Sequence, residues 1–450
     1  MPHPNTTAER VSAESAEWYR RRWVRATLAV NVLLLLLGTG FFTAYYRAWI
    51  HPDSAQPVWN GPLTAGQRQT VFDALWQEVD QRYSYLALKG IDWQARREVY
   101  WPQAQAAPDD RAFYAVLERM LASLQDGHTD LVNYPGEPVQ TAPPVIIGWV
   151  EEQPVVTTVG QSLAGRIHPG DVLTAVDGNP AAAMAATLRP YTAASTEASL
   201  NLRVAGALLR GPAGSRLSAT FRTPDGGTYT LDLERPLPGQ SGPSTAQTMI
   251  RAQEVEGFGY IRILGWQGDA ATAFDSALAQ FKTSPGLIID VRGNGGGNDV
   301  LAEQVAGRLL TTETPFTRIR LRVYPFWTPA FTRIVQPRGP WQYTGPVALL
   351  IDGRVFSSND FFVGGLARGG KVTTFGAPTG GGSGNPALIT LPGGARVRIS
   401  RWIETFSDGT PVEGNGTRPD IRVEPSIGDI ASGLDPVLET AVALLRSRQR

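Results

Sequence analysis

The sequence predicts a mixed α/β (α+β) fold made of several folded units, and three observations support this. The chain has 450 residues, more than one hydrophobic core usually organises. Helical and strand-like apolar patterns both occur, and in the second half buried runs of strand length alternate with helical patterns. With 42% hydrophobic and 18% charged residues, the chain can bury a substantial core, which argues against wholesale disorder.

Composition excludes several classes of function. Lysine plus arginine and aspartate plus glutamate both total 41, so no net charge favours nucleic acid as a partner. The absence of cysteine excludes disulfides, thiolate metal sites and a cysteine nucleophile. No group of histidines or carboxylates has the spacing of metal ligands, so we expect neither a metal nor a cofactor.

An uncharged segment near the N-terminus has the length of a membrane span. Residues 26–46 carry no charge, and a helix of that length crosses the roughly 30 Å hydrocarbon layer. Arginines are concentrated before the segment and aromatic residues flank both of its ends, which predicts a cytoplasmic tail (residues 1–25) and an extracytoplasmic remainder. A cleaved signal peptide is the alternative, but the preceding region is long and no A-x-A site follows.

The segment after a polar linker (residues 47–63) is predicted to be helical over most of residues 64–140. Apolar residues recur at helical spacing from Phe113 to Leu124. That helix would end just before the sequence Asp-Gly-His that contains His128. A lone histidine after a helix is more often structural than catalytic, so the spacing alone does not assign His128 a role.

Residues 141–236 are predicted to form a β-rich module. Its short β-type runs are VIIGWV, PVVTTV, GDVLTAVDG, LSATFRT and TYTLDLE. The stretch AGRIHPGDVLTAVDGNPAA resembles a PDZ domain, which implies that the strand near Val145 to Val150 receives a peptide C-terminus as an added strand. The alternative is a β-rich spacer without a ligand. A second linker (residues 237–246) leads to an α/β domain (residues 247–450).

Two stretches of the α/β domain each run from a buried strand through a turn towards a helix. In LIIDVRGNGGGNDV, three glycines let the backbone approach a ligand, either a phosphate or an oxyanion, but neither nucleotide fingerprint is met. In VALLIDGRVFSSNDFF, Ser357 is the candidate nucleophile and the amide of Ser358 a candidate oxyanion donor. Alternatively, either serine is only a helix cap.

An activated serine needs a base, and few candidates exist. Of the four histidines, His3 lies in the predicted tail, His51 next to the predicted span and His168 in the β-rich module. His128 remains. Lys371 is a weaker alternative because it would have to fold back onto the nucleophile.

Seven stretches, in this order, resemble the tail-specific or C-terminal processing peptidases, the serine peptidase family that also contains the tricorn core protease. The resemblance covers residues 64–135 and 247–445 and implies an α/β peptidase core with ββα-type layers around the inserted PDZ-like module. The stretches are FDALWQEVDQRY, LASLQDGHTDL, GYIRI, LIIDVRGNGGG, RVFSSNDFF, FGAPTGGGSG and DGTPVEGNGTRPDIRV.

The resemblance also implies roles for individual residues. Members with a Ser-Lys dyad have their lysine at the position of Gly382, so no dyad is expected. Histidine-type members take their base from a D-G-H-T motif, here His128, and its acidic partner from an E-G-x-G-x-x-P-D motif, here Glu413. The oxyanion donors would be the amides of Ser358 and of one glycine among residues 295–297, with Gly296 as the first choice.

Two departures from the family pattern leave alternatives open. The nucleophile is usually followed by A-x-E, but here Ser357 is followed by Ser-Asn-Asp, so Ser358 remains an alternative nucleophile. Gly127 stands where a tricorn-like member can have a serine, so a fourth catalytic residue is not identified.

The sequence therefore predicts a membrane-anchored serine endopeptidase that acts on extracytoplasmic proteins or peptides, on the periplasmic or extracellular face. Its nucleophile, base and acidic partner would be Ser357, His128 and Glu413. The PDZ-like module would bind substrate C-termini. The alternatives are a catalytically silent binding protein on the same fold and an adaptor in which the module is the working part. The sequence leaves the oligomeric state open.

Overall fold

The computed structural model describes residues 56–239 and 249–449, together with residues 30, 32 and 38–40. The chain divides into two compact units, Met1–Ser54 and Ala55–Arg450. The predicted tail and nearly all of the predicted membrane span lie outside the described residues. Within the described part, no helix is both long and apolar enough to cross a bilayer.

Three helices begin the second unit, in the segment predicted to be helical, and the last of them leads to the loop that contains His128. They are α2 (Ala65–Arg82), α3 (Trp93–Gln105) and α4 (Asp110–Ala122). Each has a side-chain N-cap, and Thr64 forms a capping box at α2. Their core is shared with two strands, β18 (Ala387–Thr390) and β19 (Arg396–Ile399). Because β1 (Asp130–Asn133) pairs with β19, the His128 loop is fastened at both ends to this layer.

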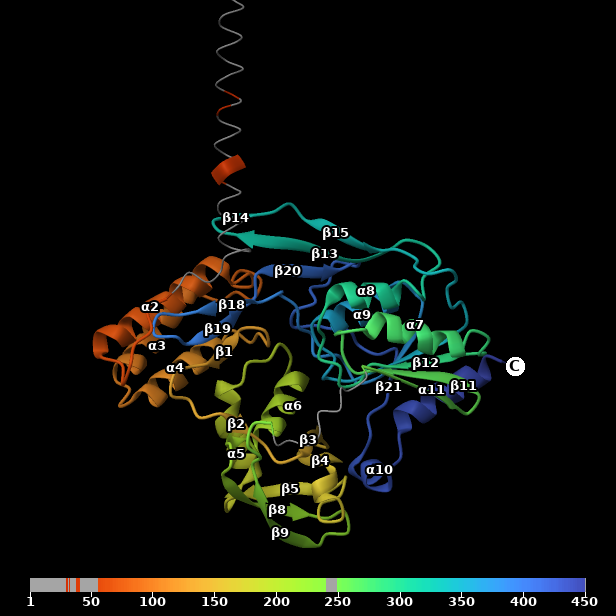
Figure 1. Ribbon diagram of the computed structural model, residues 1–450, viewed down its shortest axis with the longest axis horizontal. Coiled ribbons are helices and arrows are strands. Elements are labelled where there is room, and N and C mark those ends of the chain that lie inside the picture. Colours follow the sequence, from red (N-terminus) through yellow and green to blue (C-terminus); the bar gives the residue numbers. More distant parts are fainter. Residues whose placement is uncertain (1–29, 31, 33–37, 41–55, 240–248, 450) are drawn as a thin grey trace, which may run out of the picture. The chain divides into compact units, whose positions relative to one another are not determined.

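The β-rich module has its own hydrophobic core and a sheet with strand order β3-β4-β5-β8-β9 (Figure 1). The strands are β3 (Val145–Val150), β4 (Gln153–Val159), β5 (Val172–Val176), β8 (Arg216–Arg222) and β9 (Thr228–Glu234), with β6 (Asn179–Pro180) beside β5. All five predicted runs form strands. The predictions missed two helices, α5 (Ala181–Leu188) and α6 (Glu197–Ala207), because their many alanines leave little amphipathic pattern. A short ladder of β2 (Gln140–Thr141) and β7 (Gly211–Pro212) adjoins the module.

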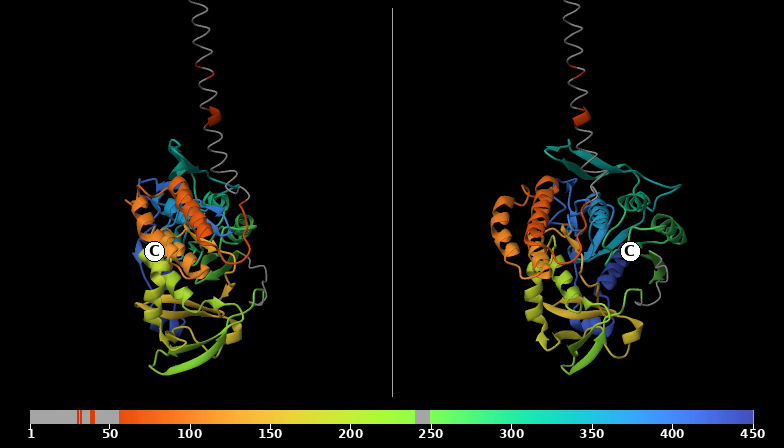
Figure 2. Two further views of the ribbon diagram at one scale, coloured as in Figure 1. Left: turned by 90° about the vertical axis from the view of Figure 1, so that its left-hand side faces the viewer. Right: turned by 60° about the vertical axis from the view of Figure 1, so that its left-hand side comes forward.

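The α/β domain contains a six-stranded sheet covered by helices on both faces (Figures 1 and 2). In sheet order its strands are β10 (Ile250–Val255), β11 (Phe258–Ile263), β12 (Leu287–Asp290), β16 (Val347–Ile351), β17 (Thr373–Gly376) and β21 (Ile421–Arg422). All pairs except β10 with β11 are parallel. One face packs against α7 (Ala270–Gln280), α8 (Asp299–Ala306) and α9 (Ser358–Arg368), and the other against α11 (Pro436–Ser447), which follows α10 (Ile427–Ser432).

This sheet explains the continuous apolar runs of the sequence. Neighbouring residues of β12 belong to different cores: Ile289 faces the α7 to α9 layer, and Ile288 faces the α11 layer. A strand buried on both faces needs apolar residues at every position. The carboxyl ends of β12 and β16 lie side by side, which brings the glycine-rich loop after β12 next to the turn that carries Ser357.

A separate antiparallel sheet was not predicted. β13 (Thr314–Val323) pairs with β15 (Phe331–Val335) on one side and with β20 (Trp402–Phe406) on the other, while β14 (Phe326–Trp327) folds back on its end. We call residues 314–335 the β13–β15 arm. It lies at the opposite end of the unit from β9 (Figure 1).

Candidate active site

The turn between β16 and α9 presents Ser357 at a helix N-terminus. Ser357 has φ 60° and ψ −129°, a conformation that residues other than glycine seldom adopt and that costs about 1–3 kcal/mol. Its amide donates to Gly382 O at 3.1 Å, and its carbonyl accepts from Phe361 N at 3.2 Å. A sharp, strained strand-to-helix turn of this kind exposes the nucleophile in other hydrolases. The predicted strand, turn and helix are all present.

The hydroxyls of the two adjacent serines are engaged differently. Ser358 Oγ donates to the carbonyl of Gly297 at 2.7 Å, and the side chain is buried. Ser357 Oγ makes no hydrogen bond to any described residue, and Ser357 lines a cavity of about 400 Å³. Because the Ser358 hydroxyl already has a structural acceptor, the geometry favours Ser357 as the nucleophile.

The next two side chains support the loops around Ser357. Asn359 Nδ2 donates to two carbonyls of the loop after β12, at 3.3 and 3.0 Å. Asp360 is fully buried and accepts hydrogen bonds from Gly382 N at 2.9 Å and from the Thr379 hydroxyl. Burial raises the pKa of Asp360 to about 7. Asp360, which stands where the usual motif has a glutamate, therefore has a structural role in this chain, as has Asn359.

Three backbone amides lie beside the turn and differ in their availability. Ser358 N, the first amide of α9, has no acceptor among the described residues. Gly296 N, the predicted second oxyanion donor, instead donates to Asn294 Oδ1 at 2.9 Å. Gly297 N has no acceptor in the part of the chain that the structure describes. A Cβ on Gly296 would lie 2.7 Å from Ser357 Cβ, so only glycine lets the loop come this close.

His128 lies in a loop fixed by Asp126. Asp126 accepts from His128 N at 2.8 Å and from the Thr129 hydroxyl at 2.7 Å, and Thr129 Oγ1 accepts from Ser400 N of the neighbouring strand at 3.1 Å. Burial lowers the pKa of His128 from 6.5 to about 4, and Asp126 opposes this shift. His128 is therefore neutral at physiological pH, the state that a general base requires.

The ring of Phe356 occupies the space beside His128. The two rings stack with their centroids 4.5 Å apart, and the Arg203 guanidinium lies 4.9 Å from the Phe356 centroid. A Cβ on Gly127 would lie 2.7 Å from this ring, and a Cβ on Gly382 would lie 2.0 Å from it. The absence of a serine before the histidine and the absence of the dyad lysine thus have one steric cause, the position of Phe356.

The structure brings His128 and Ser357 to one site without a direct bond between their side chains. The imidazole contacts Phe356, the residue before Ser357. Its Nδ1 is buried and has no hydrogen-bond partner among the described residues. Residues more than two hundred positions apart in the sequence are therefore neighbours in the fold. The hydrogen bond that would carry a proton from the Ser357 hydroxyl to the imidazole is not formed in this arrangement.

Glu413, the predicted acidic partner, contacts Lys89 instead of His128. Its carboxylate accepts from Lys89 Nζ at 2.8 Å and from Ser383 N at 3.3 Å, and it is hydrogen-bonded to Ser195. Burial raises the pKa of Glu413 to about 8, and Lys89 opposes the rise. Ser195 Oγ also accepts from the amide of Gly127 at 3.0 Å, so this serine connects Glu413 to the residue before His128.

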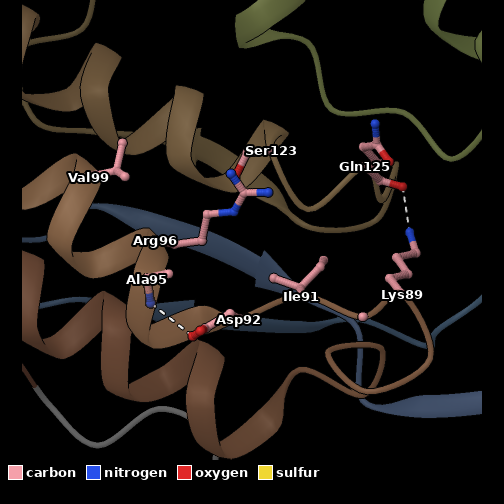
Figure 3. A pocket seen from close by; sticks show the side chains of 9 residues that line it. Lys89, Ile91, Asp92, Ala95, Arg96, Val99, Ser123 and Gln125 are labelled. Carbon is pink, nitrogen blue, oxygen red and sulfur yellow. Dashed lines mark hydrogen bonds between the residues drawn. The ribbon is translucent and has the colours of Figure 1, made fainter.

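Lys89 fastens the His128 loop from behind. Besides Glu413, its ammonium donates to the carbonyls of Leu124 at 3.3 Å and Gln125 at 2.5 Å. Figure 3 shows Lys89 reaching Gln125 at the edge of a cavity of about 390 Å³ that α3 lines on its other side. Gln125 has φ 53°, a strained conformation for a residue other than glycine. Lys89 thus donates hydrogen bonds to two carbonyls at the start of the loop and pairs with the Glu413 carboxylate.

Comparison with known proteins finds two matching family models. The family model for peptidase family S41 matches residues 257–423, and that for the Tricorn protease C1 domain matches residues 65–122. Residues 257–423 are therefore similar to the S41 peptidases, and residues 65–122 to the C1 domain of tricorn. The predicted resemblance to the tail-specific and tricorn peptidases is confirmed.

Individual S41 relatives agree with this assignment. Tricorn protease homolog 2 of Streptomyces coelicolor is 27% identical over 402 residues, which cover 79% of this chain but only 30% of that protein. The structure of mature CPAF matches with a TM-score of 0.70 at 15% identity, covering 85% of this chain and 96% of that one. The photosystem II D1 C-terminal processing protease matches with a TM-score of 0.52 at 20% identity, covering 81% and 94%. These structural matches confirm the mixed α/β peptidase fold.

Several residues of the site were not predicted from the sequence. Phe356, Arg203, Ser195 and Lys89 all contact the His128 loop or Glu413, yet they come from different elements, up to 324 residues from their partner. Phe356 was within a quoted motif, but nothing in its neighbours indicated that it stacks on His128. The scarcity of lysine was the only signal for Lys89.

Proposed function

We propose that the chain is a membrane-anchored serine endopeptidase that cleaves extracytoplasmic proteins or peptides. Ser357 attacks the scissile carbonyl, and His128 accepts its proton and returns it to the leaving amine. The amides of Ser358 and Gly297 hold the oxyanion, each contributing about 3 kcal/mol of barrier lowering. Gly296 N, given its bond to Asn294, holds the shape of the glycine-rich loop.

The observation that carries this proposal is the turn at Ser357. A strained residue at a helix N-terminus, with a hydroxyl unbonded to the described residues and two unpaired amides beside it, has little structural purpose. The arrangement suits a nucleophile and the negative charge that develops after its attack.

Substrate binding would complete the proton path. In the present arrangement His128 stacks on Phe356, so its imidazole has to turn towards the Ser357 hydroxyl. We propose that Ser195 then joins Nδ1 of His128 to Glu413, since its hydroxyl already contacts both Glu413 and the amide of Gly127. Glu413 would fix the tautomer of the base through this serine.

The anchor and the module define where the peptidase would act. The uncharged segment at residues 26–46 supports one membrane span with the N-terminus in the cytoplasm and the peptidase outside. The PDZ-like resemblance, with β3 at the edge of its sheet and α6 packed beside it, supports binding of substrate C-termini by strand addition.

A second candidate is a catalytically silent binding protein on the same fold. One observation favours it: His128 and Ser357 share no hydrogen bond, and Phe356 is the direct neighbour of the imidazole. Such a protein would keep the S41 fold and the peptide-binding edge and would hydrolyse nothing.

Labelling with a fluorophosphonate probe separates the two candidates. The full chain in detergent is treated with the probe, digested, and the labelled peptide is identified by mass spectrometry. We expect label on Ser357, loss of it in Ser357→Ala, and labelling slowed at least about 100-fold in His128→Gln. Label on Ser358 would identify Ser358 as the nucleophile in place of Ser357. No label on folded protein would favour the binding protein.

A further inference from the structure

The β13–β15 arm carries exposed aromatic and aliphatic side chains that no element of the described part of the chain covers. Among the described residues, Tyr324 is 46% exposed, Phe326 59%, Phe331 47% and Ile334 49%. All four come from a segment of only 22 positions, residues 314–335. Exposed apolar side chains that gather in one place usually mark a contact surface rather than ordinary surface.

The arm also carries positive charge without any negative charge. Four arginines and no acidic residue occur in residues 314–335. Arg318 and Arg320 are exposed and form no ion pair with any described residue. Arg320 lies 5.4 Å and Arg322 5.3 Å from the ring of Trp327, so these guanidinium groups and this indole share one face of the arm. Phe326 and Phe331 pair with Val323 and Ile319 and therefore lie on the other face. This combination is typical of a surface that meets the headgroup region of a membrane.

We propose that the β13–β15 arm docks on an anionic phospholipid bilayer. This inference rests on the proposed membrane anchor. Residues 47–55, between the predicted span and the first continuously described residues, can bridge at most about 30 Å. A peptidase held that close to its membrane can bring a surface feature into contact with it. Aromatic side chains would enter the interface, and the arginines would pair with lipid phosphates.

A second copy of the chain is a poorer occupant for this face. A symmetric dimer would place the same patch of each subunit against the other. Arg318 and Arg320 would then approach their own counterparts without an acidic residue of the arm to separate them. A phospholipid bilayer supplies the missing negative charge and accepts the aromatic side chains as well.

Fluorescence quenching in nanodiscs tests this docking. The chain has no cysteine, so Phe326→Cys carries a single bimane label, with Thr228→Cys on β9 as the matched exposed control. The full chain is placed in discs of phosphatidylglycerol and phosphatidylcholine that contain nitroxide lipids. We expect quenching at position 326 at least three-fold stronger than at position 228. Equal quenching at the two positions would overturn the proposal.

Charge reversal separates lipid contact from contact with a second copy of the chain. In Arg318→Glu/Arg320→Glu, quenching at position 326 should fall to the control level, because each arginine contributes roughly five-fold to binding an anionic surface. Quenching that is unchanged by this variant and by pure phosphatidylcholine, but that disappears in discs holding one chain, would indicate a second copy and overturn lipid docking.

The same preparation distinguishes failure of the arm from failure of the anchor. If the chain does not co-elute with the discs, the proposal of a membrane anchor is wrong. Sedimentation of the same chain with phosphatidylglycerol vesicles then tests the binding of the arm alone. Binding that is lost in Arg318→Glu/Arg320→Glu would keep the proposal, and absence of binding would end it. Peptidase activity in solution should be the same in all these variants.

Discussion

The two halves of the active site are built in opposite ways. The turn at Ser357 lies within one contiguous stretch of strand, turn and helix. Its strand, β16, pairs with β12, which leads into the glycine-rich loop. The His128 loop is held by side chains from the segment before α3, from the β-rich module and from the C-terminal region, among them Lys89, Ser195 and Arg203. The nucleophile is thus positioned locally, and the base depends on distant parts of the chain.

The largest effect should come from the local half. Ser357→Ala is expected to lower kcat/KM for an unstructured protein substrate at least about 10⁴-fold, because the nucleophile is lost while the turn remains. Ser358→Ala, the matched control, removes only the bond to Gly297 and should lower it no more than about 10-fold. Comparable losses in both variants would mean that the two hydroxyls are not functionally distinct.

Titration of His128 should have the next largest effect. Burial lowers its pKa to about 4 from 6.5, so the folded chain stays neutral there while the unfolded chain binds a proton. The contribution of His128 to stability should therefore fall as the pH falls from 6.5 to 4, by up to about 3 kcal/mol, and should not change above pH 6.5. Asp360 and Glu413, whose pKa values are raised, contribute in the opposite direction.

Urea unfolding at several pH values measures this dependence. The unfolding free energy of the parent chain should fall relative to that of His128→Gln as the pH falls from 6.5 to 4. Its difference from His168→Gln, which alters an exposed histidine, should stay nearly constant. The acid limb of kcat/KM should also lie below pH 6, because protonation of the base is shifted downwards. An acid limb near 6.5 would show that the imidazole is exposed in the working enzyme.

The position of Phe356 predicts a smaller effect on stability, in which substitutions at positions 356 and 382 depend on each other. Gly382→Ala places a Cβ 2.0 Å from the Phe356 ring and should lower stability by about 2 kcal/mol, whereas Gly206→Ala, with nothing within 4 Å, should not lower it. Phe356→Ala removes the ring, so the alanine at 382 should have almost no further effect on stability in the double variant. Additive losses in this cycle would contradict the proposed clash.

The smallest effect should come from the support behind the base. Lys89→Met removes the partner of Glu413 and of two loop carbonyls, which should misplace His128 slightly and lower kcat/KM about 10-fold with little change in KM. It should also raise the pKa of Glu413 further, because Lys89 opposes the effect of burial. Lys371→Met is the matched control among the three lysines. A loss confined to KM would assign Lys89 to substrate binding.

Local patterns along the chain were sufficient to predict the elements that carry the nucleophile. Helical spacing predicted α4, the apolar runs predicted β12 and β16, and the serine after a buried strand predicted the turn at Ser357. The β13–β15 arm was missed although Ile319, Leu321 and Val323 alternate with arginines, as in a half-buried strand. No local pattern indicated that β15 and β20 would be its partners.

The side chains that surround the base were set by the packing of the layers and not by any local pattern. No local rule predicts that Phe356 stacks on His128, that Ser195 reaches Gly127 across 68 residues or that Glu413 pairs with Lys89. Backbone patterns depend on residues a few positions apart, because hydrogen bonding and side-chain periodicity act over one or two turns. Contacts between loops depend on how the layers pack, and packing brings together residues whose separation along the chain carries no information about their distance in space.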